Sequence, residues 1–212
     1  MARGRFITFE GGEGAGKSTQ VRRLAERLSG AAPELVVTRE PGGSTGAEAI
    51  RDLLVRGAVD RWSPTTETLL MYAARRDHIE RVITPALDRG AWVLCDRFAD
   101  STRAYQGAAG GAPASLIAAL EQDVLAGLAP DLTLVLDLPA EAGLARVTAR
   151  GQGETRFEDK GPAFHQRLRE AFLRIAAAEP ARCAVIDAAP GPDDVARAIF
   201  AAVHDRLGAG VL

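Results

Sequence analysis

Residues 5–19 read RFITFEGGEGAGKST. Within them, the eight residues from Gly11 to Ser18 match the pattern G-x-x-x-x-G-K-[S/T]. A short β-prone segment, residues 5–9, precedes the match, and apolar residues at helical spacing follow it as far as Leu28. A glycine-rich loop between a strand and a helix lets backbone N–H groups converge on phosphate oxygens. This stretch therefore predicts a strand, a phosphate-binding loop and a helix that together bind a nucleoside triphosphate.

Two residues of the loop carry the expected chemistry. Lys17 is placed to reach the terminal phosphates, and the hydroxyl of Ser18 is placed to ligate Mg²⁺. Lys17 and Lys160 are the only lysines of the chain, which otherwise uses arginine for positive charge. A lysine retained in this background indicates that a compact point charge is needed where a planar guanidinium would not fit. A chance glycine-rich turn is the weaker interpretation.

Composition limits the other properties of the chain. Its 212 residues suit one α/β domain, and 26 basic against 28 acidic residues leave no electrostatic footprint for nucleic acid. The N-terminus is too poor in apolar residues for a signal peptide, and no apolar run reaches membrane-spanning length. Cys95 and Cys183 lie in apolar strand patterns and are expected in the core. We therefore expect a cytoplasmic protein without a membrane or nucleic-acid partner.

The apolar pattern alternates strands with helices along the chain. Short continuous apolar runs, typical of buried parallel strands, cover residues 5–9, 35–38, 91–95, 132–137 and 184–187. The expected helices cover residues 17–28, about 45–56, about 64–88, 113–127, 140–149, 162–178 and 192–206. This order predicts a single domain, residues 1–212, with a five-stranded parallel sheet flanked by helices. Two loops, 39–46 and 150–161, are too rich in glycine and charge to be plain connections.

Charged residues follow the second and third expected strands, at the sheet edge where open α/β sheets bind ligands. Asp96 and Arg97 end the third strand. An aspartate there can orient Mg²⁺, and an arginine there can clamp a phosphate. Arg51, on the helix after the second strand, is a candidate for a phosphate on a second substrate. A surface Asp–Arg pair and an ordinary solvated helix arginine stay open as alternative interpretations.

Several segments occur in an order and spacing that point to one family. They read FEGGEGAGKST at 9–19, TREPGG at 38–43, AARRDH at 73–78, DRF at 96–98 and STRAYQG at 101–107. In this order the segments resemble those of the bacterial thymidylate kinases, and the similarity continues through Arg156–Glu158 to the last strand. The glycine loop alone is generic, whereas the combination is specific. The resemblance covers essentially the whole chain.

The resemblance implies transfer of the γ-phosphoryl group of ATP to dTMP, which gives dTDP and ADP for dTTP synthesis. It implies a nucleoside monophosphate kinase fold of the P-loop NTPase type, a homodimer, and Mg²⁺ held by Ser18 and Asp96. The catalytic residues that it implies are Lys17, Arg97, Arg156, Asp96 and Glu13. The ATP-binding residues that it implies are Gly11, Gly12, Glu13, Gly14, Ala15, Gly16, Lys17, Ser18, Thr19, Arg146 and Arg150.

For dTMP, the resemblance assigns the acceptor phosphate to Arg97 and Arg51. It places Glu13 near the sugar 3′-hydroxyl, where a carboxylate can accept a hydrogen bond. Tyr105 looks like the aromatic residue that packs against the sugar and excludes a 2′-hydroxyl. A core aromatic is the alternative for Tyr105. The full implied set is Glu13, Arg39, Glu40, Arg51, Met71, Tyr72, Arg75, Arg97, Ser101, Thr102, Tyr105 and Gln106.

The thymine contacts depart from the family pattern in two places. Arg75 and Gln106 look like donors to the thymine ring. The family often has a phenylalanine that stacks on thymine, but this chain has Met71 and Tyr72 before Arg75. Positions three and four residues apart share a helix face, so either residue could cover the base. Some relatives carry an amide where this chain has Thr102, whose hydroxyl reaches less far.

Residues 146–161 are expected to form a lid. Glycines interrupt this segment, and Arg150 and Arg156 flank the interruption. The phosphate loop contains no arginine, although the transferring phosphate needs its charge stabilised, and a closing lid can deliver one. The chain therefore resembles the subgroup of thymidylate kinases whose lid supplies the catalytic arginine. We expect Arg156 in this role, with Arg150 as its rival and a plain solvated loop as the alternative.

Two other functions would use some of the same motifs. A kinase for another small nucleotide or nucleoside would also have the glycine loop, the acidic strand end and the lid. A nucleotide-binding switch would need a partner surface and a water-positioning residue, and the sequence has no guanine-specifying Asn-Lys-x-Asp run. A phosphoryl-transfer assay across nucleosides and nucleoside monophosphates separates these alternatives from a dTMP kinase.

Overall fold

A computed structural model describes residues 3–30, 34–151 and 155–208 of the chain. Five parallel strands form one sheet in the order β2-β3-β1-β4-β5. They are β1 (Phe6–Glu10), β2 (Leu35–Arg39), β3 (Trp92–Asp96), β4 (Leu132–Asp137) and β5 (Cys183–Asp187). These positions confirm the five-stranded parallel sheet that the apolar pattern predicts.

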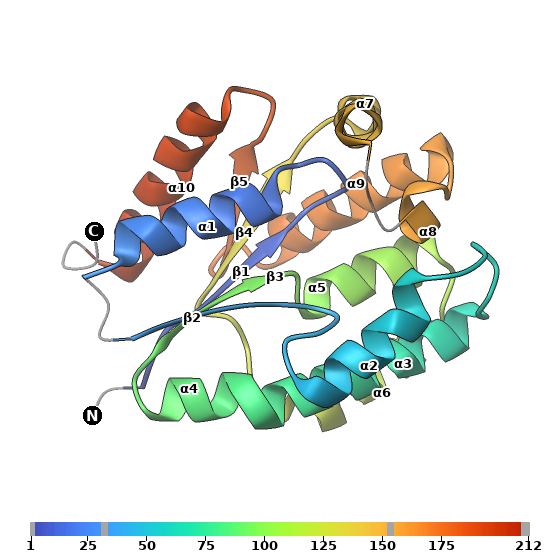
Figure 1. Ribbon diagram of the computed structural model, residues 1–212, viewed down its shortest axis with the longest axis horizontal. Helices are drawn as coiled ribbons and strands as arrows, with labels where there is room; N and C mark the ends of the chain where they lie inside the picture. The colour runs from blue at the N-terminus through green and yellow to red at the C-terminus, as the bar shows by residue number, and fades with distance from the viewer. Residues whose placement is uncertain (1–2, 31–33, 152–154, 209–212) are drawn as a thin grey trace.

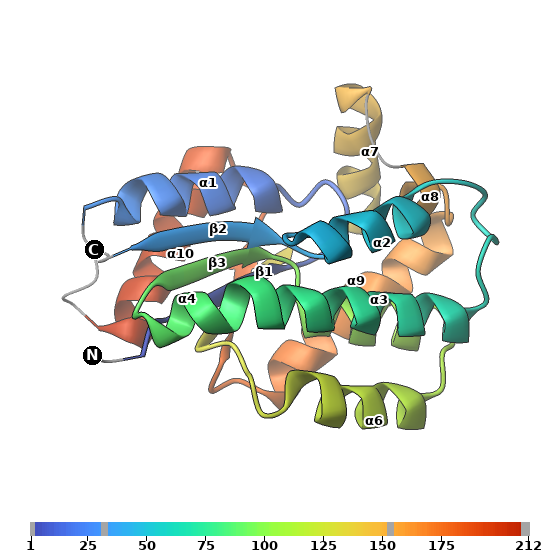
Figure 2. The same ribbon diagram turned by 60° about the horizontal axis from the view of Figure 1, so that its bottom comes forward.

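Helices cover both faces of this sheet. They are α1 (Lys17–Leu28), α2 (Thr45–Val55), α3 (Pro64–His78), α4 (Thr84–Asp88), α5 (Ala99–Thr102), α6 (Ala114–Leu125), α7 (Ala140–Arg150), α8 (Thr155–Glu158), α9 (Pro162–Ala178) and α10 (Pro192–Leu207), with π-helical turns η1 (Ile79–Ile83) and η2 (Arg103–Ala109). Helices α1 and α10 pack on one face, and η1, α4 and α9 pack on the other (Figure 1). Helix α2 lies beside α3, and α6 packs beneath α3 (Figure 2).

The central strand β1 is buried along its whole length. On one face Ile7 and Phe9 pack with Leu24 of α1 and Ile199 of α10. On the other face Phe6 packs with the apolar residues of η1 and α4. Burial on both faces explains why the strand reads as a continuous apolar run instead of an alternating one. It also fixes the end of β1, from which the glycine loop starts.

The structure also bears on the two cysteines, on membrane-spanning helices and on clusters of metal-ligating side chains. Cys95 and Cys183 are buried free thiols, as expected of core residues. Burial raises the pKa of the Cys183 thiol to about 11. Over residues 3–30, 34–151 and 155–208, no helix has the length and apolar character that crossing a membrane requires. The same residues contain no group of three or more His, Cys, Asp or Glu side chains that could hold a metal by themselves.

The expectation of a helical stretch over about 64–88 is confirmed, because helical backbone continues from α3 through the π-helical turn η1 into α4 without a break. Pro85 stands at the start of α4, where its missing N–H cannot complete the α-helical ladder, and the backbone widens just before it. The structure also forms α5 and η2 over 99–109, a segment to which the apolar pattern assigns no element. Residues 152–154 of the expected lid lie outside the described part of the chain.

Candidate active site

The glycine loop between β1 and α1 touches α7 directly. Gly14 has a φ of +70°, and a Cβ atom there would lie 2.1 Å from the carbonyl oxygen of Gly143 in α7. A Cβ atom on Gly143 would in turn lie 2.3 Å from the carbonyl oxygen of Glu13. Only glycine at both positions permits this approach. The contact holds α7, with Arg146 and Arg150, beside the phosphate loop.

Lys17 lies inside the curve of the loop. Its Nζ atom donates to the carbonyl oxygens of Gly11, at 3.2 Å, and Gly12, at 2.8 Å. Burial lowers the pKa of Lys17 to about 8, and the charge of Arg97 adds to this shift while that of Glu13 opposes it. A phosphate group bound in the loop would supply the negative charge that favours the protonated lysine. The position therefore suits a lysine that binds phosphate.

Ser18 and Asp96 meet at the C-terminal edge of the sheet. The hydroxyl of Ser18 donates to the Oδ2 atom of Asp96 over 2.6 Å. The register of β1 with β3 pairs Phe9 with Asp96, which brings the aspartate level with the start of the loop. A hydroxyl and a carboxylate are oxygen ligands of the kind that Mg²⁺ prefers, together with substrate phosphates and water. This pair fits the expected magnesium site.

Arg97 connects the third strand to the loop. It is a non-glycine residue with a φ of +71°, a conformation that L-residues adopt at a cost. Its Nη1 atom donates to the carbonyl oxygen of Gly11, at 2.9 Å, and to the hydroxyl of Ser101, at 3.2 Å. Its Nη2 atom donates to Glu13 over 3.1 Å. The guanidinium therefore lies against the phosphate loop, where it can meet a phosphate bound at the loop's edge.

Glu13 is ionised and surrounded by donors. It accepts hydrogen bonds from Arg97 and from the hydroxyl of Tyr105, the latter at 2.6 Å. Burial alone would raise the pKa of Glu13, but Arg97, Lys17 and the Tyr105 hydrogen bond together lower it to about 2. The guanidinium carbon of Arg97 also lies 4.8 Å from the centre of the Tyr105 ring. These residues form one connected group beside the loop.

Arg75 on α3 is buried and held by three acceptors. Its Nε atom donates to Glu40 over 2.7 Å, and its Nη2 atom donates to the Phe98 carbonyl oxygen and the Thr102 hydroxyl, each at 3.0 Å. Glu40 also contacts the Nδ1 atom of the buried His78 at 3.0 Å. The Nη1 atom of Arg75 is buried without a hydrogen-bond partner among the described residues. Arg75 thus has a fixed orientation and one donor unused.

The two candidates for covering a base have different surroundings. Met71 lines the same pocket as Arg75. The side chain of Tyr72 is buried against α6, and its hydroxyl donates to Glu121 over 3.2 Å. Of the two residues, Met71 is therefore the one in position to contact a ligand.

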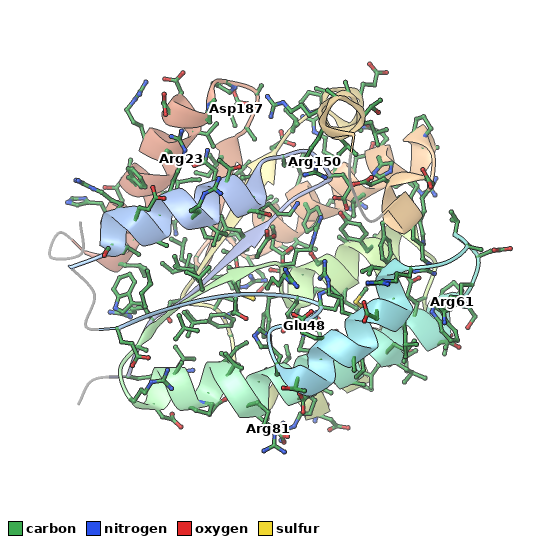
Figure 3. The ribbon with its side chains drawn as sticks, in the orientation of Figure 1. Arg23, Glu48, Arg61, Arg81, Arg150 and Asp187 are labelled. Atoms are coloured by element: carbon green, nitrogen blue, oxygen red, sulfur yellow. The ribbon has the colours of Figure 1, made fainter. Side chains whose placement is uncertain are left out.

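One pocket of about 550 Å³ joins these groups, a volume in the range of small-molecule sites. Most of the expected site residues line it: Glu13, Gly14, Gly16, Lys17, Ser18, Thr19, Arg39, Glu40, Arg51, Met71, Arg75, Asp96, Arg97, Ser101, Thr102, Tyr105, Gln106, Arg146 and Arg150. Arg150 reaches it from the end of α7 (Figure 3). Five expected residues are not among those lining it: Gly11, Gly12, Ala15, Tyr72 and Arg156.

Comparison with known proteins identifies the family. The family model described as thymidylate kinase matches residues 9–199. This chain belongs to the thymidylate kinase family. It is 70% identical to the thymidylate kinase of Caulobacter vibrioides over 208 residues, which cover 98% of this chain and 100% of that protein. The thymidylate kinase of Bradyrhizobium diazoefficiens is 57% identical over 207 residues, which cover 97% of this chain and 91% of that protein.

A solved structure agrees with the sequence relatives. The crystal structure of thymidylate kinase from Ehrlichia chaffeensis matches with a TM-score of 0.77 and 33% identity, over 95% of this chain and 99% of that chain. The fold is therefore that of the P-loop nucleoside monophosphate kinases, as the resemblance implied. Membership of the thymidylate kinase family also makes the chain a kinase.

Arg156, the lid arginine that the sequence favoured for catalysis, does not line the pocket. Arg156 is buried, and its guanidinium contacts the end of α2 and Glu67 of α3. The expectation was a closing lid that brings Arg156 to the transferring phosphate, whereas this arginine is enclosed by backbone carbonyls and a carboxylate. Arg156 as the catalytic residue stays a prediction that this arrangement does not favour, and Arg150 is the lid arginine that lines the pocket.

Sequence reasoning missed Glu10, the last residue of β1. Its carboxylate accepts hydrogen bonds from the Phe98 N–H at 2.8 Å, the Ser101 N–H at 3.3 Å and the Ser101 hydroxyl at 2.5 Å. Burial, and then the charge of Asp100, raise the pKa of Glu10 to about 7. The carboxylate thereby holds the segment that follows Arg97. The signal in the sequence is an acidic residue that ends an otherwise apolar buried strand.

Proposed function

We propose that this protein transfers the γ-phosphoryl group of ATP to dTMP, giving dTDP and ADP for dTTP synthesis. We propose that it does so as a single nucleoside monophosphate kinase domain. Family membership supports the reaction. The observation that carries the choice of acceptor is the buried Arg75, whose orientation is fixed and whose Nη1 donor lacks a partner among the described residues. A buried donor without a partner is costly, and a ring carbonyl of thymine would satisfy it.

The acceptor end of the pocket would bind dTMP through residues from several elements. Gln106 and Met71 lie in the pocket with Arg75, where they would contact the base. The ionised carboxylate of Glu13 would accept a hydrogen bond from the 3′-hydroxyl. Tyr105, held by its bond to Glu13, would pack against the sugar and exclude a 2′-hydroxyl.

The acceptor phosphate would lie between the loop and α2. Arg97 faces this space from the end of β3, and Arg51 and Arg39 line it from α2 and β2. The oxygen of dTMP that attacks is already ionised near neutral pH, so the protein needs no strong general base. Its task is to position the two substrates and to neutralise the charge that spreads over the transferring group. The arginines and Lys17 supply that charge.

The donor end would bind ATP. Loop backbone N–H groups and Lys17 would contact its phosphates, and Arg146 and Arg150 would approach from α7. Ser18 and Asp96 fit a magnesium site and would hold the ion beside the phosphates. Mg²⁺ supplies neutralisation of the phosphate charge when bound. We assign the charge-stabilising lid arginine to Arg150, because it lines the pocket and Arg156 does not.

The assay is phosphoryl transfer from ATP·Mg²⁺ to each nucleoside monophosphate, with thymidine included. We expect kcat/KM to be highest for dTMP, and ADP to form only when an acceptor is present. A higher kcat/KM for another monophosphate or for thymidine would contradict the acceptor assignment. Multiple-turnover ADP release without any acceptor would favour a regulatory ATPase instead.

We infer that the protein works in the cytoplasm as a homodimer. Family resemblance supports the dimer, and two exposed leucines, Leu53 on α2 and Leu69 on α3, offer apolar side chains for such a contact. Light scattering of the purified protein measures the mass directly. A concentration-independent monomer mass would contradict the dimer, and Leu69→Glu should convert a dimer into monomer if this surface is involved.

A further inference from the structure

Arg156 of α8 is among the largest fully buried side chains of the molecule. Its Nε atom donates to the carbonyl oxygen of Ala58 over 3.1 Å, and its Nη1 atom to that of Leu54 over 2.9 Å. Its Nη2 atom donates to the carbonyl oxygen of Val59 over 3.3 Å. Every guanidinium nitrogen is thus engaged. All three carbonyls belong to the end of α2 or to the loop after it.

These carbonyls explain why a charge is needed there. The last turn of a helix leaves carbonyl oxygens without intrahelical partners and carries partial negative charge. The last turn of α2 has no basic residue of its own. Arg156 supplies the missing positive charge from a segment about a hundred positions later in the sequence. It therefore helps to fix the helix that carries Arg51.

The same guanidinium also contacts α3. Its Nη2 atom lies 2.5 Å from the Oε2 atom of Glu67, whose side chain is buried. The other oxygen of Glu67 accepts a hydrogen bond from Gln106 over 2.8 Å, and Lys160 lies 3.8 Å from it. One carboxylate therefore joins α8 to Gln106. Gln106 itself lines the pocket.

We infer that Arg156 is a positioning residue for dTMP. It holds α8 beside α2 (Figure 2) and is paired with Glu67 of α3, and it acts on the reaction through Arg51 and Gln106, without touching the transferring phosphoryl group. The inference rests on the proposed function, because it takes Gln106 and Arg51 as part of the dTMP site. It predicts an effect on dTMP affinity, whereas a phosphoryl-contacting arginine would act on kcat.

The test is a double-mutant cycle with Arg156→Gln, Glu67→Gln and the double variant. Steady-state kinetics give kcat and both KM values, and calorimetry gives dTMP affinity without ATP. We expect each single change to raise the KM and the dissociation constant of dTMP about tenfold or more, with the KM of ATP little changed. We expect the double variant to be no worse than the more affected single variant, because contacting residues are not additive.

A matched control uses another arginine–glutamate pair. Arg174 and Glu170 form an exposed pair on α9, with nitrogen and oxygen 3.8 Å apart. The changes Arg174→Gln and Glu170→Gln should leave dTMP affinity close to that of the wild type, since exposed pairs contribute little. This control separates the effect of the buried pair from that of losing charge.

Three outcomes would overturn the inference. The first is that Arg156→Gln lowers kcat while both affinities stay unchanged. The second is that the two single effects multiply in the double variant. If Arg156→Gln does not fold, Glu67→Gln decides alone: a raised dTMP dissociation constant supports the inference, and an unchanged one overturns it. A wild-type protein that binds no dTMP would contradict the proposed function itself, which the calorimetry shows separately.

Discussion

The arginine–glutamate pairs Arg97–Glu13 and Arg156–Glu67 differ in what their charges can still reach. In the pair Arg97–Glu13 the atoms are 3.1 Å apart, and the side chains are 16% and 20% exposed. In the pair Arg156–Glu67 they are 2.5 Å apart, and the side chains are 1% and 4% exposed. The first pair opens on the pocket, so a substrate phosphate or hydroxyl can join it. The second is enclosed, so its charge serves packing. The same residue types thus hold helices together in one place and, under the proposed function, would bind substrate in the other.

The largest expected effect is a loss of stability when the enclosed pair Arg156–Glu67 is broken. Arg156→Met should lower the free energy of unfolding by about 3–5 kcal/mol, because it leaves the Glu67 carboxylate buried without its main counter-charge. Arg97→Met should lower it clearly less, because its pair is open to water. Urea unfolding of both variants measures the difference. The double variant Arg156→Met, Glu67→Met should regain stability, and equal losses for the two single variants would contradict the distinction.

The next largest effect is a loss of kcat when positive charge is removed only from the end of the pocket that would bind ATP. Lys17→Ala should lower kcat by roughly 10²–10³, the usual cost of losing one donor that stabilises transition-state charge. Affinity for dTMP should be largely kept, because Lys17 lies inside the loop that would bind ATP phosphates. Kinetics with each substrate varied, and dTMP calorimetry, check both statements. Lost dTMP affinity with intact ATP affinity would show that the donor and acceptor ends are assigned wrongly.

A smaller effect depends on pH and concerns the open pair. The pKa of Glu13 is about 2 in the folded protein against an ordinary value of 4.5, so folding favours its ionised form. Its contribution to stability is therefore complete above about pH 4.5 and is lost as the pH falls toward 2. Unfolding free energies at pH 6 and pH 3 should differ more for the wild type than for Glu13→Gln. Equal differences would mean that the pair with Arg97 adds no pH dependence.

The smallest expected effect distinguishes the role of the Tyr105 hydroxyl from that of its aromatic ring. Tyr105→Phe keeps the ring beside Arg97 and removes the donor that reaches Glu13 over 2.6 Å. One hydrogen bond to a charged group is worth a few kcal/mol at most, so kcat/KM for dTMP should fall about 3- to 10-fold. Discrimination against a ribonucleotide should stay, because the ring still fills the space. Lost discrimination in Tyr105→Phe would assign the specificity to the hydroxyl.

The fold could be predicted because its signals are local. Each strand is a short apolar run that needs no distant partner to be recognised, and the glycine loop is a continuous motif. The π-helical turn η1 inside the helical stretch 64–88 has a local cause as well. Apolar spacing continues through residues 79–88, and only the missing N–H of Pro85 marks the change of helix type.

The site was harder, because its decisive contacts join segments far apart in sequence. Arg156 reads as a lid charge until Leu54, Ala58 and Val59 are seen to enclose it. Which of Met71 and Tyr72 faces the pocket depends on α6, which occupies one side of α3. The acidic end of an apolar strand singles out Glu10, but its partners, the backbone N–H groups after β3, are about ninety residues away in the sequence.

Because Gly14 and Gly143 are in close contact, α7 can tilt about the point where it touches the phosphate loop. Arg150 stands seven residues beyond Gly143, which is about 10 Å along the helix axis. A tilt of α7 by about 10° around this contact would move Arg150 by roughly 2 Å, while the phosphate loop itself hardly shifts. A side chain larger than hydrogen at residue 143 would push α7 away from the loop and would carry Arg150 away from the proposed ATP site. Gly143→Ala would therefore weaken the hold on ATP from a position that carries no charge and contributes no hydrogen-bonding side chain.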